Sequence, residues 1–252
     1  MKQTDYLVIG AGIAGLTTAY LLSEFGDVLV VTKGKLKQAN TYWAQGGIAA
    51  VLAKDDSFES HVQNTMDAGV GYANKFAVKY LVENGPKAIR FLESVGVKFY
   101  PEPDLEAGHS CARVWRTSDF TGQDILSQLI KVTKRQDRIT FLEDVDVVEL
   151  LVQNGECKGA FVRYEDEKEL EPIVAKSTIL STGGCGQLFG RTTNTKGSAG
   201  DGLAMVVNAG LDLQDMEFFQ FHPTALDKPE NGRYFLLSET LRGFGAKVVA
   251  HN

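Results

Sequence analysis

Three glycines near the N-terminus have the spacing that binds the phosphates of a dinucleotide. Gly10, Gly12 and Gly15 follow the apolar run of residues 6–9 and open an apolar, helix-like stretch. In this pattern the glycines permit a tight turn, a close approach of the backbone to a pyrophosphate, and close packing of a helix whose N-terminus faces the anion. The pattern alone is weak evidence, but its place between a strand and a helix favours dinucleotide binding over a purely structural turn.

The end of the next strand departs from the usual dinucleotide-binding pattern. Residues 28–31 predict a second buried strand, so the first 32 residues form one βαβ unit. An acidic residue normally follows this strand and binds the ribose hydroxyls, but Thr32 and Lys33 stand there. A threonine hydroxyl is able to bond a ribose, so the glycine pattern leaves the kind of dinucleotide open.

Helices are expected between the first βαβ unit and the strands that begin at residue 139. Their signals cover residues 58–66, 76–95 and 125–135. The middle range is interpreted as two helices, because Pro86 is suited to the start of the second and Gly96 to its end. Residues 121–124 (TGQD) have the spacing of a capping box and are expected to open the last of these helices.

From residue 139 the hydrophobic period changes to that of strands. The expected strands are residues 139–143, 145–152, 159–164, 173–175 and 178–180. Asn154 and Gly155 predict a hairpin turn. A Gly-Asp-Gly turn at residues 200–202 precedes a short helix, where the alternative role of Asp201 is that of a helix N-cap. Strands alternating with helices place the chain in the α/β class.

Composition excludes several kinds of protein. The chain has 252 residues, 44% hydrophobic and 23% charged, with a net charge of −6, which is typical of a globular domain and not of a disordered, collagenous or nucleic-acid-binding chain. Three distant cysteines fit neither a disulfide framework nor a metal site. With no signal-type segment and no long apolar run, we expect a cytoplasmic protein without a membrane span.

Longer motifs extend the interpretation beyond the glycine pattern. Residues 40–50 (NTYWAQGGIAA) resemble a flavin-contacting loop of the succinate dehydrogenase and fumarate reductase flavoprotein superfamily. Residues 192–202, 217–224 (EFFQFHPT) and 238–243 (SETLRG) match further motifs of that superfamily in the same order. The resemblance implies a Rossmann-like FAD-binding domain of the glutathione-reductase type with inserted strands, at residues 1–217, followed by the start of an α+β capping domain at residues 218–252.

Three positions make the chain most similar to the L-aspartate oxidases within this superfamily. Asn40 stands where the respiratory flavoproteins carry the histidine that bonds to FAD, which implies noncovalent FAD. Glu106 matches a glutamate typical of aspartate oxidases, and residues 32–34 (TKG) resemble their Ser-Lys-Gly. The implied cofactor-binding residues are Gly10, Ala11, Gly12, Ile13, Ala14, Gly15, Lys33, Asn40, Thr41, Tyr42, Trp43, Ala44, Gln45, Gly46, Gly47, Val147, Thr182, Gly183 and Asp201.

The same resemblance implies the residues that handle the substrate. His222 would bind a substrate carboxylate, although a histidine among aromatic residues is more often a hydrogen-bonded core residue. Ser238 and Glu239 match a Thr-Glu pair that binds a carboxylate and orients the catalytic groups. Arg242 is interpreted as a structural ion-pair partner, and Phe244 departs from a glutamate common at its position, which weakens the case for a proton relay there.

Glu106 also has a chemical argument of its own. A substrate with an ammonium group beside two carboxylates needs one anionic partner, which a succinate site would not tolerate. His109, Arg113 and Arg116 lie near Glu106 in the sequence, and for both arginines a solvated surface position is the favoured interpretation.

The resemblance implies oxidation of L-aspartate to iminoaspartate by hydride transfer to FAD, with oxygen or fumarate as acceptor, as a first step of NAD biosynthesis. Quinolinate synthase is the expected pathway successor. The catalytic arginine would lie beyond residue 252, so the chain is expected to be about half of an enzyme. The alternatives are a soluble fumarate reductase or succinate oxidase, and a noncatalytic flavin-binding protein.

Overall fold

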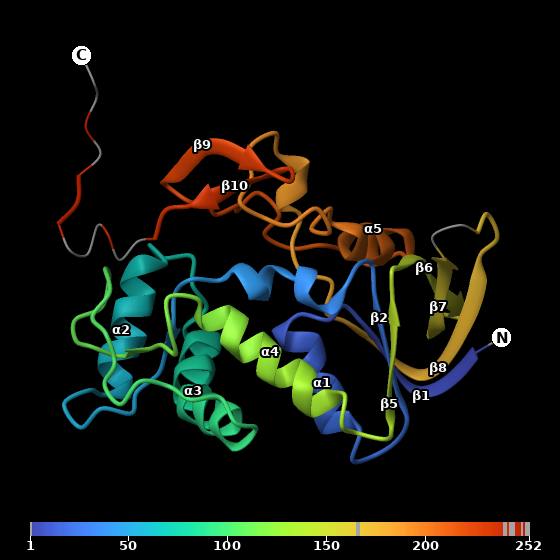
Figure 1. Cartoon of the computed structure of the whole chain (residues 1–252), viewed down its shortest axis with the longest axis horizontal. Coiled ribbons are helices and arrows are strands. Elements are labelled where there is room, and N and C mark those ends of the chain that lie inside the picture. The colour runs from blue at the N-terminus through green and yellow to red at the C-terminus, as the bar shows by residue number, and fades with distance from the viewer. Residues whose placement is uncertain (1, 165–166, 239–240, 242–244, 248, 250–252) are drawn as a thin grey trace. The chain divides into compact units, whose positions relative to one another are not determined.

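In a computed structural model, the chain forms a mixed α/β structure (Figure 1). The structure describes residues 2–164, 167–238, 241, 245–247 and 249. Two compact units are distinguished: the first contains residues 1–43 and 129–236, and the second contains residues 44–128 and 237–252. Each unit is described by itself below.

A six-stranded sheet forms the centre of the first unit. Its strand order is β5-β2-β1-β8-β7-β6. The strands are β1 (Lys2–Ile9), β2 (Val28–Thr32), β5 (Ile139–Glu143), β6 (Val145–Gln153), β7 (Glu156–Tyr164) and β8 (Glu171–Leu180). β5, β2, β1 and β8 are parallel, whereas β7 and β6 continue the sheet in antiparallel pairing.

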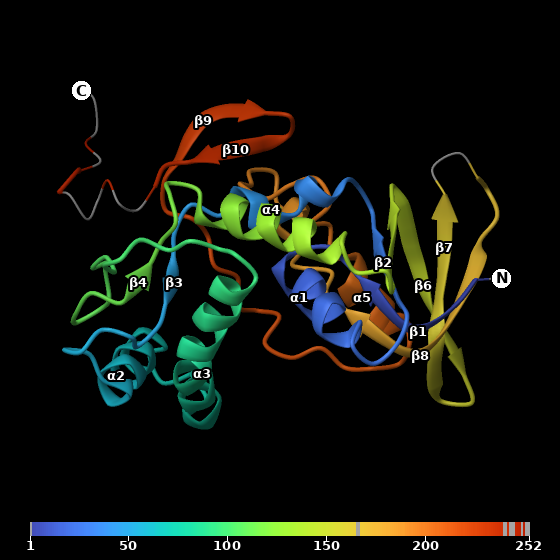
Figure 2. The same cartoon turned by 60° about the horizontal axis from the view of Figure 1, so that its bottom comes forward.

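The two faces of the parallel strands are covered differently. Along a strand, side chains alternate between faces. Leu7 and Leu29 therefore share a buried cluster with β6, β7, β8 and Met205 of α5 (Asp201–Asn208). Val8 and Val30 are also fully buried, and α1 (Ile13–Leu22) lies beside β1 and β2 in both views (Figures 1 and 2). Burial on both faces explains why these strands are apolar throughout.

A smaller hairpin completes the described part of the first unit. It consists of β9 (Ala225–Glu230) and β10 (Arg233–Leu236), which pair antiparallel. The amide N–H of Tyr234 donates to the carbonyl oxygen of Thr192 at 2.7 Å and so joins the hairpin to the preceding loop.

Helices dominate the second unit. α2 (Phe58–Ala68) packs against α3 (Lys75–Ser94), and a short antiparallel pair is formed by β3 (Ile48–Ala49) and β4 (Val114–Trp115). The first eight residues of α4 (Thr121–Thr133) belong to this unit, and the rest belong to the first. Among the described residues, no helix has the length and apolar character that crossing a membrane requires.

Most expected elements are confirmed, and three are corrected. The parallel pairing of residues 6–9 with 28–31 is present, and Asn154 and Gly155 both have positive φ in the turn between β6 and β7, as a type I′ turn requires. The strands expected at 173–175 and 178–180 are parts of the single strand β8, because residues 171–174 pair with β7 while residues 173–180 pair with β1.

The two helices expected in residues 76–95 form the single helix α3. Pro86 lies inside it and is buried, on the same side as Val78, Val82 and Ile89. This apolar stripe at helical spacing continues through the proline, so packing of the stripe outweighs the hydrogen bond that proline cannot make.

The capping box expected at residues 121–124 is also absent. Thr121 lies inside α4 and is buried; its hydroxyl accepts from the amide of Thr117 at 3.2 Å. The Asp124 carboxylate accepts from the hydroxyls of Thr117 and Ser118 at 2.7 Å and 2.6 Å. The side chains of Thr121 and Asp124 therefore bind the turn that precedes α4.

Candidate functional site

The carboxyl ends of three parallel strands meet at one edge of the sheet in the first unit. The amide of Gly10, after β1, donates to Val31 O at 2.8 Å, and the amide of Ser181, after β8, donates to Ile9 O at 2.8 Å. Gly10 has φ of +108°, and a Cβ there would lie 2.2 Å from Ser181 O. Only glycine permits this contact, and ligands of α/β proteins bind at such an edge.

The structural reason for glycine differs between the two later positions of the pattern. A Cβ on Gly15 would lie 1.9 Å from Gly10 O, so α1 packs directly on the turn that precedes it. A Cβ on Gly12 would meet only Thr41 Oγ1, at an ordinary 3.4 Å. Nothing described in the chain requires glycine at position 12, which is the N-cap of α1. This is the position at which the backbone would approach a pyrophosphate, so the cradle fits that group.

Residues 40–43 form a 3₁₀ turn that is fastened to both the cradle and a distant loop. Thr41 Oγ1 accepts from the amide of Ile13 at 3.1 Å, which satisfies one first-turn donor of α1. Asn40 Nδ2 donates to Asn194 and Ser198, while its Oδ1 accepts from the amide of Thr195 at 2.8 Å. The Asn40 amide therefore joins residues 194–198 to the 3₁₀ turn.

Two predicted cofactor residues form an ion pair at the same edge. Lys33 Nζ, just after β2, lies 2.8 Å from Asp201 Oδ2, with both side chains about half exposed. Gly200, with φ of +83°, occupies the N-cap of α5, so the N-cap role considered for Asp201 is wrong and its carboxylate is engaged by Lys33. Thr182 packs against the same turn, since a Cβ on Gly202 would lie 1.9 Å from Thr182 Oγ1.

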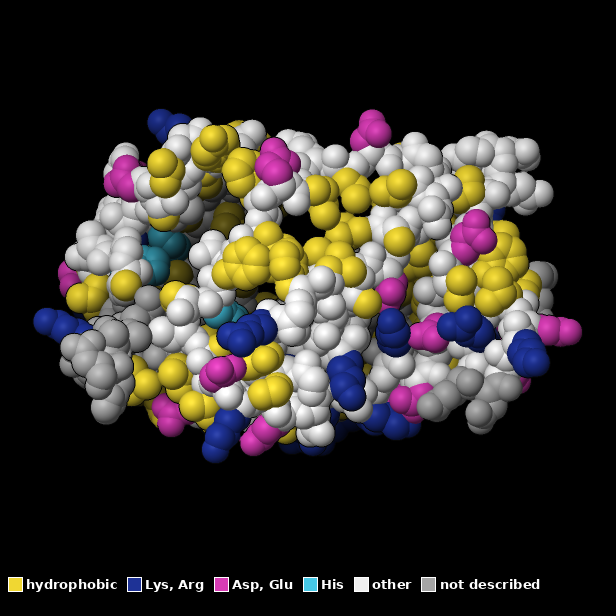
Figure 3. Space-filling view, turned by 90° about the horizontal axis from the view of Figure 1, so that it is seen from above, with side chains coloured by type: hydrophobic (Ala, Val, Ile, Leu, Met, Phe, Trp, Pro, Cys, Tyr) yellow, Lys and Arg dark blue, Asp and Glu magenta, His cyan; other side chains and the backbone are white. Residues whose placement is uncertain are grey.

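His222 lies in an exposed aromatic neighbourhood in the first unit. Its Nδ1 is 2.7 Å from Thr193 Oγ1. Phe219 and Phe221, on either side in the sequence, stack with Phe189 and with each other at centroid distances of 4.4 to 5.2 Å. Many hydrophobic side chains are exposed on the face that Figure 3 shows. His222 is thus held by a hydroxyl, and not buried as an ordinary core histidine.

Three further predicted cofactor residues of the first unit have the following surroundings. Trp43 carries the guanidinium of Arg233 over its ring at 3.6 Å, and burial lowers the pKa of Arg233. Val147 lies on β6 at the edge of the buried cluster, beside a register shift. Gly183 has φ of +71° in the turn after β8.

The other predicted residues belong to the second unit or lie outside the described residues. Ala44 O accepts from the Gly122 amide at 3.0 Å, and a Cβ on Gly47 would lie 2.5 Å from Trp115 O. Those assigned to the second unit are Ala44, Gln45, Gly46, Gly47, Glu106 and Ser238. Glu239, Arg242 and Phe244 lie outside the described residues.

The surface positions expected for two arginines are wrong. The Arg113 side chain is 0% exposed and is paired with the equally buried Asp56 carboxylate. Arg116 is 18% exposed and is paired with Asp104. Burial alone would lower the pKa of Arg113, but its hydrogen bonds to Asp56 and Cys111 outweigh burial and raise it. The sequence predicts a surface position for both arginines because a charged residue in a polar segment is usually solvated, and the sequence does not reveal the carboxylate that pairs with it.

Sequence reasoning also missed the residues that contact His222 and Arg113. Thr193 lies in the motif of residues 192–202, but nothing in that motif indicates its contact with His222. Ser60 and Asn64, which bind Arg113, lie four residues apart on α2, a spacing that places side chains on one side of a helix, whereas Asp56 lies just before α2. That spacing was the available signal.

Comparison with known proteins places this geometry in a family. Residues 5–252 match the family model described as "FAD binding domain". The chain belongs to this FAD-binding family. FAD is accordingly its cofactor, and the glycine cradle at the end of β1 is the part of the chain that fits the FAD pyrophosphate.

This FAD-binding chain is similar to curated L-aspartate oxidases. It is 38% identical to L-aspartate oxidase 1 of Ralstonia nicotianae, over 97% of this chain and 48% of the relative. It is 39% identical to L-aspartate oxidase of Synechocystis sp., over 98% and 46%. The chain thus spans about half the length of these relatives.

Solved structures support the fold of the FAD-binding chain. A variant of E. coli quinol fumarate reductase matches with a TM-score of 0.89 and 30% identity, over 97% of this chain and 43% of that one. A flavocytochrome c3 fumarate reductase matches with a TM-score of 0.86 and 28% identity, over 97% and 46%. The mixed sheet is therefore that of these flavoproteins.

The ion pair at the cradle gives a first prediction. Asp201→Asn is expected to raise the dissociation constant for FAD about tenfold, because Lys33 loses the partner that positions it at the cofactor edge. The free energy of unfolding without FAD should change by less than about 1 kcal/mol, since the pair is half exposed. FAD titration and urea unfolding test both values; equal FAD affinity in variant and wild type would refute the role.

Proposed function

We propose that this chain is the FAD-binding part of an enzyme that oxidises L-aspartate to iminoaspartate. The observation that carries the proposal is the 36–40% identity to L-aspartate oxidases over nearly the whole chain. In this reaction the α-carbon of aspartate loses a hydride and the amine loses a proton. The electrons then pass to oxygen, giving hydrogen peroxide, or to fumarate, giving succinate.

FAD supplies the hydride acceptor, and the residues of the chain hold the reactants. Gly10 to Gly15 would hold the pyrophosphate, and the rest of the cofactor would be lined by Lys33, Asp201, Val147, Thr182, Gly183 and residues 40–47. Asn40 supports noncovalent binding, because an amide has no ring nitrogen to alkylate and both its ends are bonded to the protein.

His222 is proposed to bind a substrate carboxylate through Nε2. If the Thr193 hydroxyl donates to Nδ1, the imidazole proton is placed on Nε2, where it can donate to the carboxylate. Ser238 would bind the same or the second carboxylate by its hydroxyl, and Glu239 would orient the catalytic groups.

Glu106 is proposed to bind the ammonium group of aspartate. The residue lies in a loop of the second unit that also contains His109 and Arg113. A carboxylate there favours an amino dicarboxylate and disfavours succinate, which has no cation to neutralise it.

A second candidate is a fumarate reductase or succinate oxidase with noncovalent FAD. It is supported by the TM-score of 0.89 to a fumarate reductase. Glu106 favours the aspartate reaction over this candidate, for the reason of charge given above.

The proposal extends to the domain bounds, the cellular compartment and the enzyme that uses the product. We infer a glutathione-reductase-type FAD domain at residues 1–217 and the beginning of an α+β cap at residues 218–252. The three cysteines are free, which fits a reducing compartment such as the cytoplasm. Iminoaspartate would pass to quinolinate synthase in NAD biosynthesis.

Turnover by the whole polypeptide encoded by the gene tests the proposal. We expect L-aspartate to support hydrogen peroxide formation in air and succinate formation from fumarate under nitrogen. Succinate should not replace aspartate as the electron donor. Turnover with succinate but not with aspartate would instead establish the second candidate.

Thr193 gives a second prediction. Thr193→Val removes the hydroxyl that contacts His222 Nδ1 and is expected to raise the KM for aspartate about five- to tenfold. Thr193→Ser retains the hydroxyl and should stay close to wild type. Steady-state kinetics of both variants check this; equal KM values for valine and serine would show that the hydroxyl does not position His222.

A further inference from the structure

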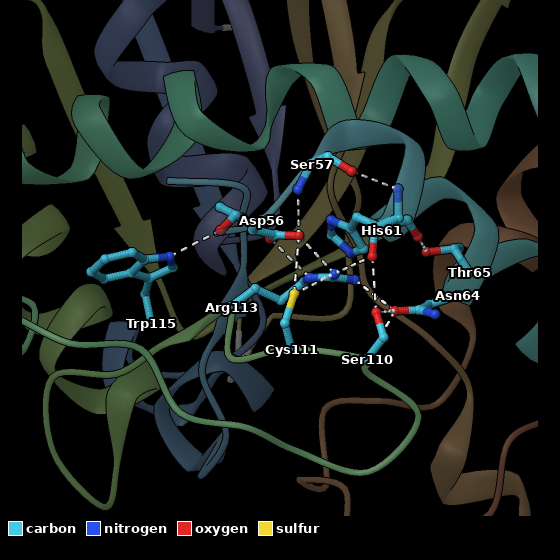
Figure 4. A network of polar contacts seen from close by, with 11 residues as sticks. Asp56, Ser57, His61, Asn64, Thr65, Ser110, Cys111, Arg113 and Trp115 are labelled. Carbon is cyan, nitrogen blue, oxygen red and sulfur yellow. Dashed lines mark hydrogen bonds and ion pairs between the residues drawn. The ribbon is translucent and has the colours of Figure 1, made fainter. Parts of the chain in front are cut away.

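The buried Arg113 is the centre of a polar network in the second unit (Figure 4). Its Nε and Nη2 donate to the two oxygens of Asp56 at 3.0 Å and 2.7 Å, in the paired geometry that suits a guanidinium. Nη1 donates to Asn64 Oδ1 at 2.8 Å, and Nη2 also contacts Ser60 Oγ at 3.0 Å. A buried charge needs this degree of pairing to be tolerated.

Three polar residues contact Arg113, and we call them the α2 clamp: Asp56, just before α2, and Ser60 and Asn64 on α2. The clamp also holds the residues that precede Arg113. Both the amide and the hydroxyl of Ser110 donate to Asn64 Oδ1 at 2.9 Å, and the Cys111 thiol donates to Asp56 Oδ1 at 3.1 Å.

The other end of the same segment is fixed by strand pairing. Asp104 and Val114 exchange backbone hydrogen bonds of 2.9 Å and 3.1 Å. Residues 105–113 therefore form a closed loop that contains Glu106. Within it the amide of His109 donates to Glu106 O at 3.2 Å, and the rings of His109 and His61 lie 5.7 Å apart.

Apolar packing does little to fix the tip of this loop. Leu105 is 62% exposed, and Ala107 and Gly108 are exposed as well. Buried ion pairs are in general weak contributors to stability, and their best use is to specify one conformation. The contacts of the α2 clamp restrict the loop on the side of residues 110–113.

We propose that the α2 clamp, acting through Arg113 and Ser110, positions Glu106 and thereby sets the preference for an amino dicarboxylate over a plain dicarboxylate. This rests on the proposed function. Recognition of an ammonium group depends on the place of the facing carboxylate to within a fraction of an ångström. A loop that samples several conformations would keep the charge of Glu106 but lose the geometry. Arg113, Ser110 and Asn64 are therefore positioning residues.

Asn64→Leu in the whole polypeptide tests this. It removes the acceptor shared by Ser110 and Arg113 Nη1 but leaves the Arg113–Asp56 pair and the Ser60–Ser110 hydroxyl contact intact. We expect the aspartate-to-succinate ratio, which is kcat/KM for L-aspartate divided by the association constant of succinate as a competitive inhibitor, to fall about tenfold, mainly through KM for aspartate. Limited proteolysis should cut residues 105–109 faster. Asn64→Asp, which retains an acceptor oxygen, should restore most of the ratio.

Gln63→Leu is the matched control, since Gln63 is the exposed neighbour on α2 and bonds only to Asp67 in the described contacts. It should leave both the ratio and the cleavage rate unchanged. If Asn64→Leu does not fold, Ser110→Ala carries the same expectation, with a loss of about threefold.

The failures are distinguishable. Absence of aspartate turnover in the wild-type polypeptide would overturn the proposed function. Wild-type turnover together with an unchanged aspartate-to-succinate ratio in folded Asn64→Leu or Ser110→Ala would overturn this inference alone.

Discussion

Gly15→Ala is expected to abolish FAD binding and to destabilise the first unit. The added Cβ would lie 1.9 Å from Gly10 O and 2.9 Å from Gly10 C, and both atoms are backbone. Relief requires α1 to move away from the turn after β1, where the amides that would face the pyrophosphate of FAD are located. We expect about 1–3 kcal/mol of lost stability, as for other overpacked sites. FAD titration and thermal unfolding measure the two effects.

Gly12→Ala separates cofactor binding from folding at the same turn. Its Cβ would meet only Thr41 Oγ1 at 3.4 Å, so the stability without FAD should remain near wild type. The methyl group would occupy space needed for the pyrophosphate, and affinity for FAD should fall about a hundredfold. Gly190→Ala, at a position with open space, is the control. Normal FAD affinity in Gly12→Ala would contradict the assignment of the cradle.

Glu106→Gln is expected to have the largest effect on substrate choice. Glutamine keeps the shape of the side chain but removes the charge that would pair with the substrate ammonium group. Loss of one partner of a close charge pair costs about 2–5 kcal/mol when buried, and the half-buried position of Glu106 places the expected loss of kcat/KM for aspartate at about thirty- to a hundredfold. Succinate, relieved of repulsion, should bind better.

The control for this variant is Glu102→Gln, in the exposed segment that leads into the same loop. It should change neither kcat/KM for aspartate nor the binding of succinate. Unchanged turnover of aspartate in Glu106→Gln would show that Glu106 does not bind the ammonium group, even if the enzyme is an aspartate oxidase.

The parallel strands were predictable because a short, continuously apolar run is typical of a strand that is buried on both faces. Residues 6–9 and 28–31 are apolar at every position, as strands buried on both faces must be. The Asn154-Gly155 turn was predictable for a related reason, since few residue pairs adopt two positive φ angles. In both cases a local requirement determines the residue types.

The misinterpreted elements depend on side-chain contacts that the local residue pattern does not reveal. Pro86 read as a helix start because its missing amide is a local signal, whereas the apolar stripe of α3 is a packing signal that outweighs it. Thr121 and Asp124 have capping-box spacing, yet their side chains bond to Thr117 and Ser118. Arg113 read as solvated because its partner Asp56 lies 57 residues away.

The candidate site shows the same division. The glycine spacing, together with its place between a strand and a helix, predicted the turn after β1, although the contact of Gly10 with Ser181 joins segments that are distant in sequence. The bonds of Asn40 to residues 194–198, the Lys33–Asp201 pair and the Thr193–His222 contact each join segments that are distant in sequence or unrelated in motif. Such contacts become visible only when the chain is folded.

Anaerobic mixing of the FAD-loaded whole polypeptide with L-aspartate, and separately with succinate, tests the central claim most directly. The visible absorption band of the flavin should bleach with aspartate and persist with succinate, because hydride transfer from the α-carbon is the proposed reaction. Bleaching by succinate alone, or by neither compound while FAD is demonstrably bound, would contradict it.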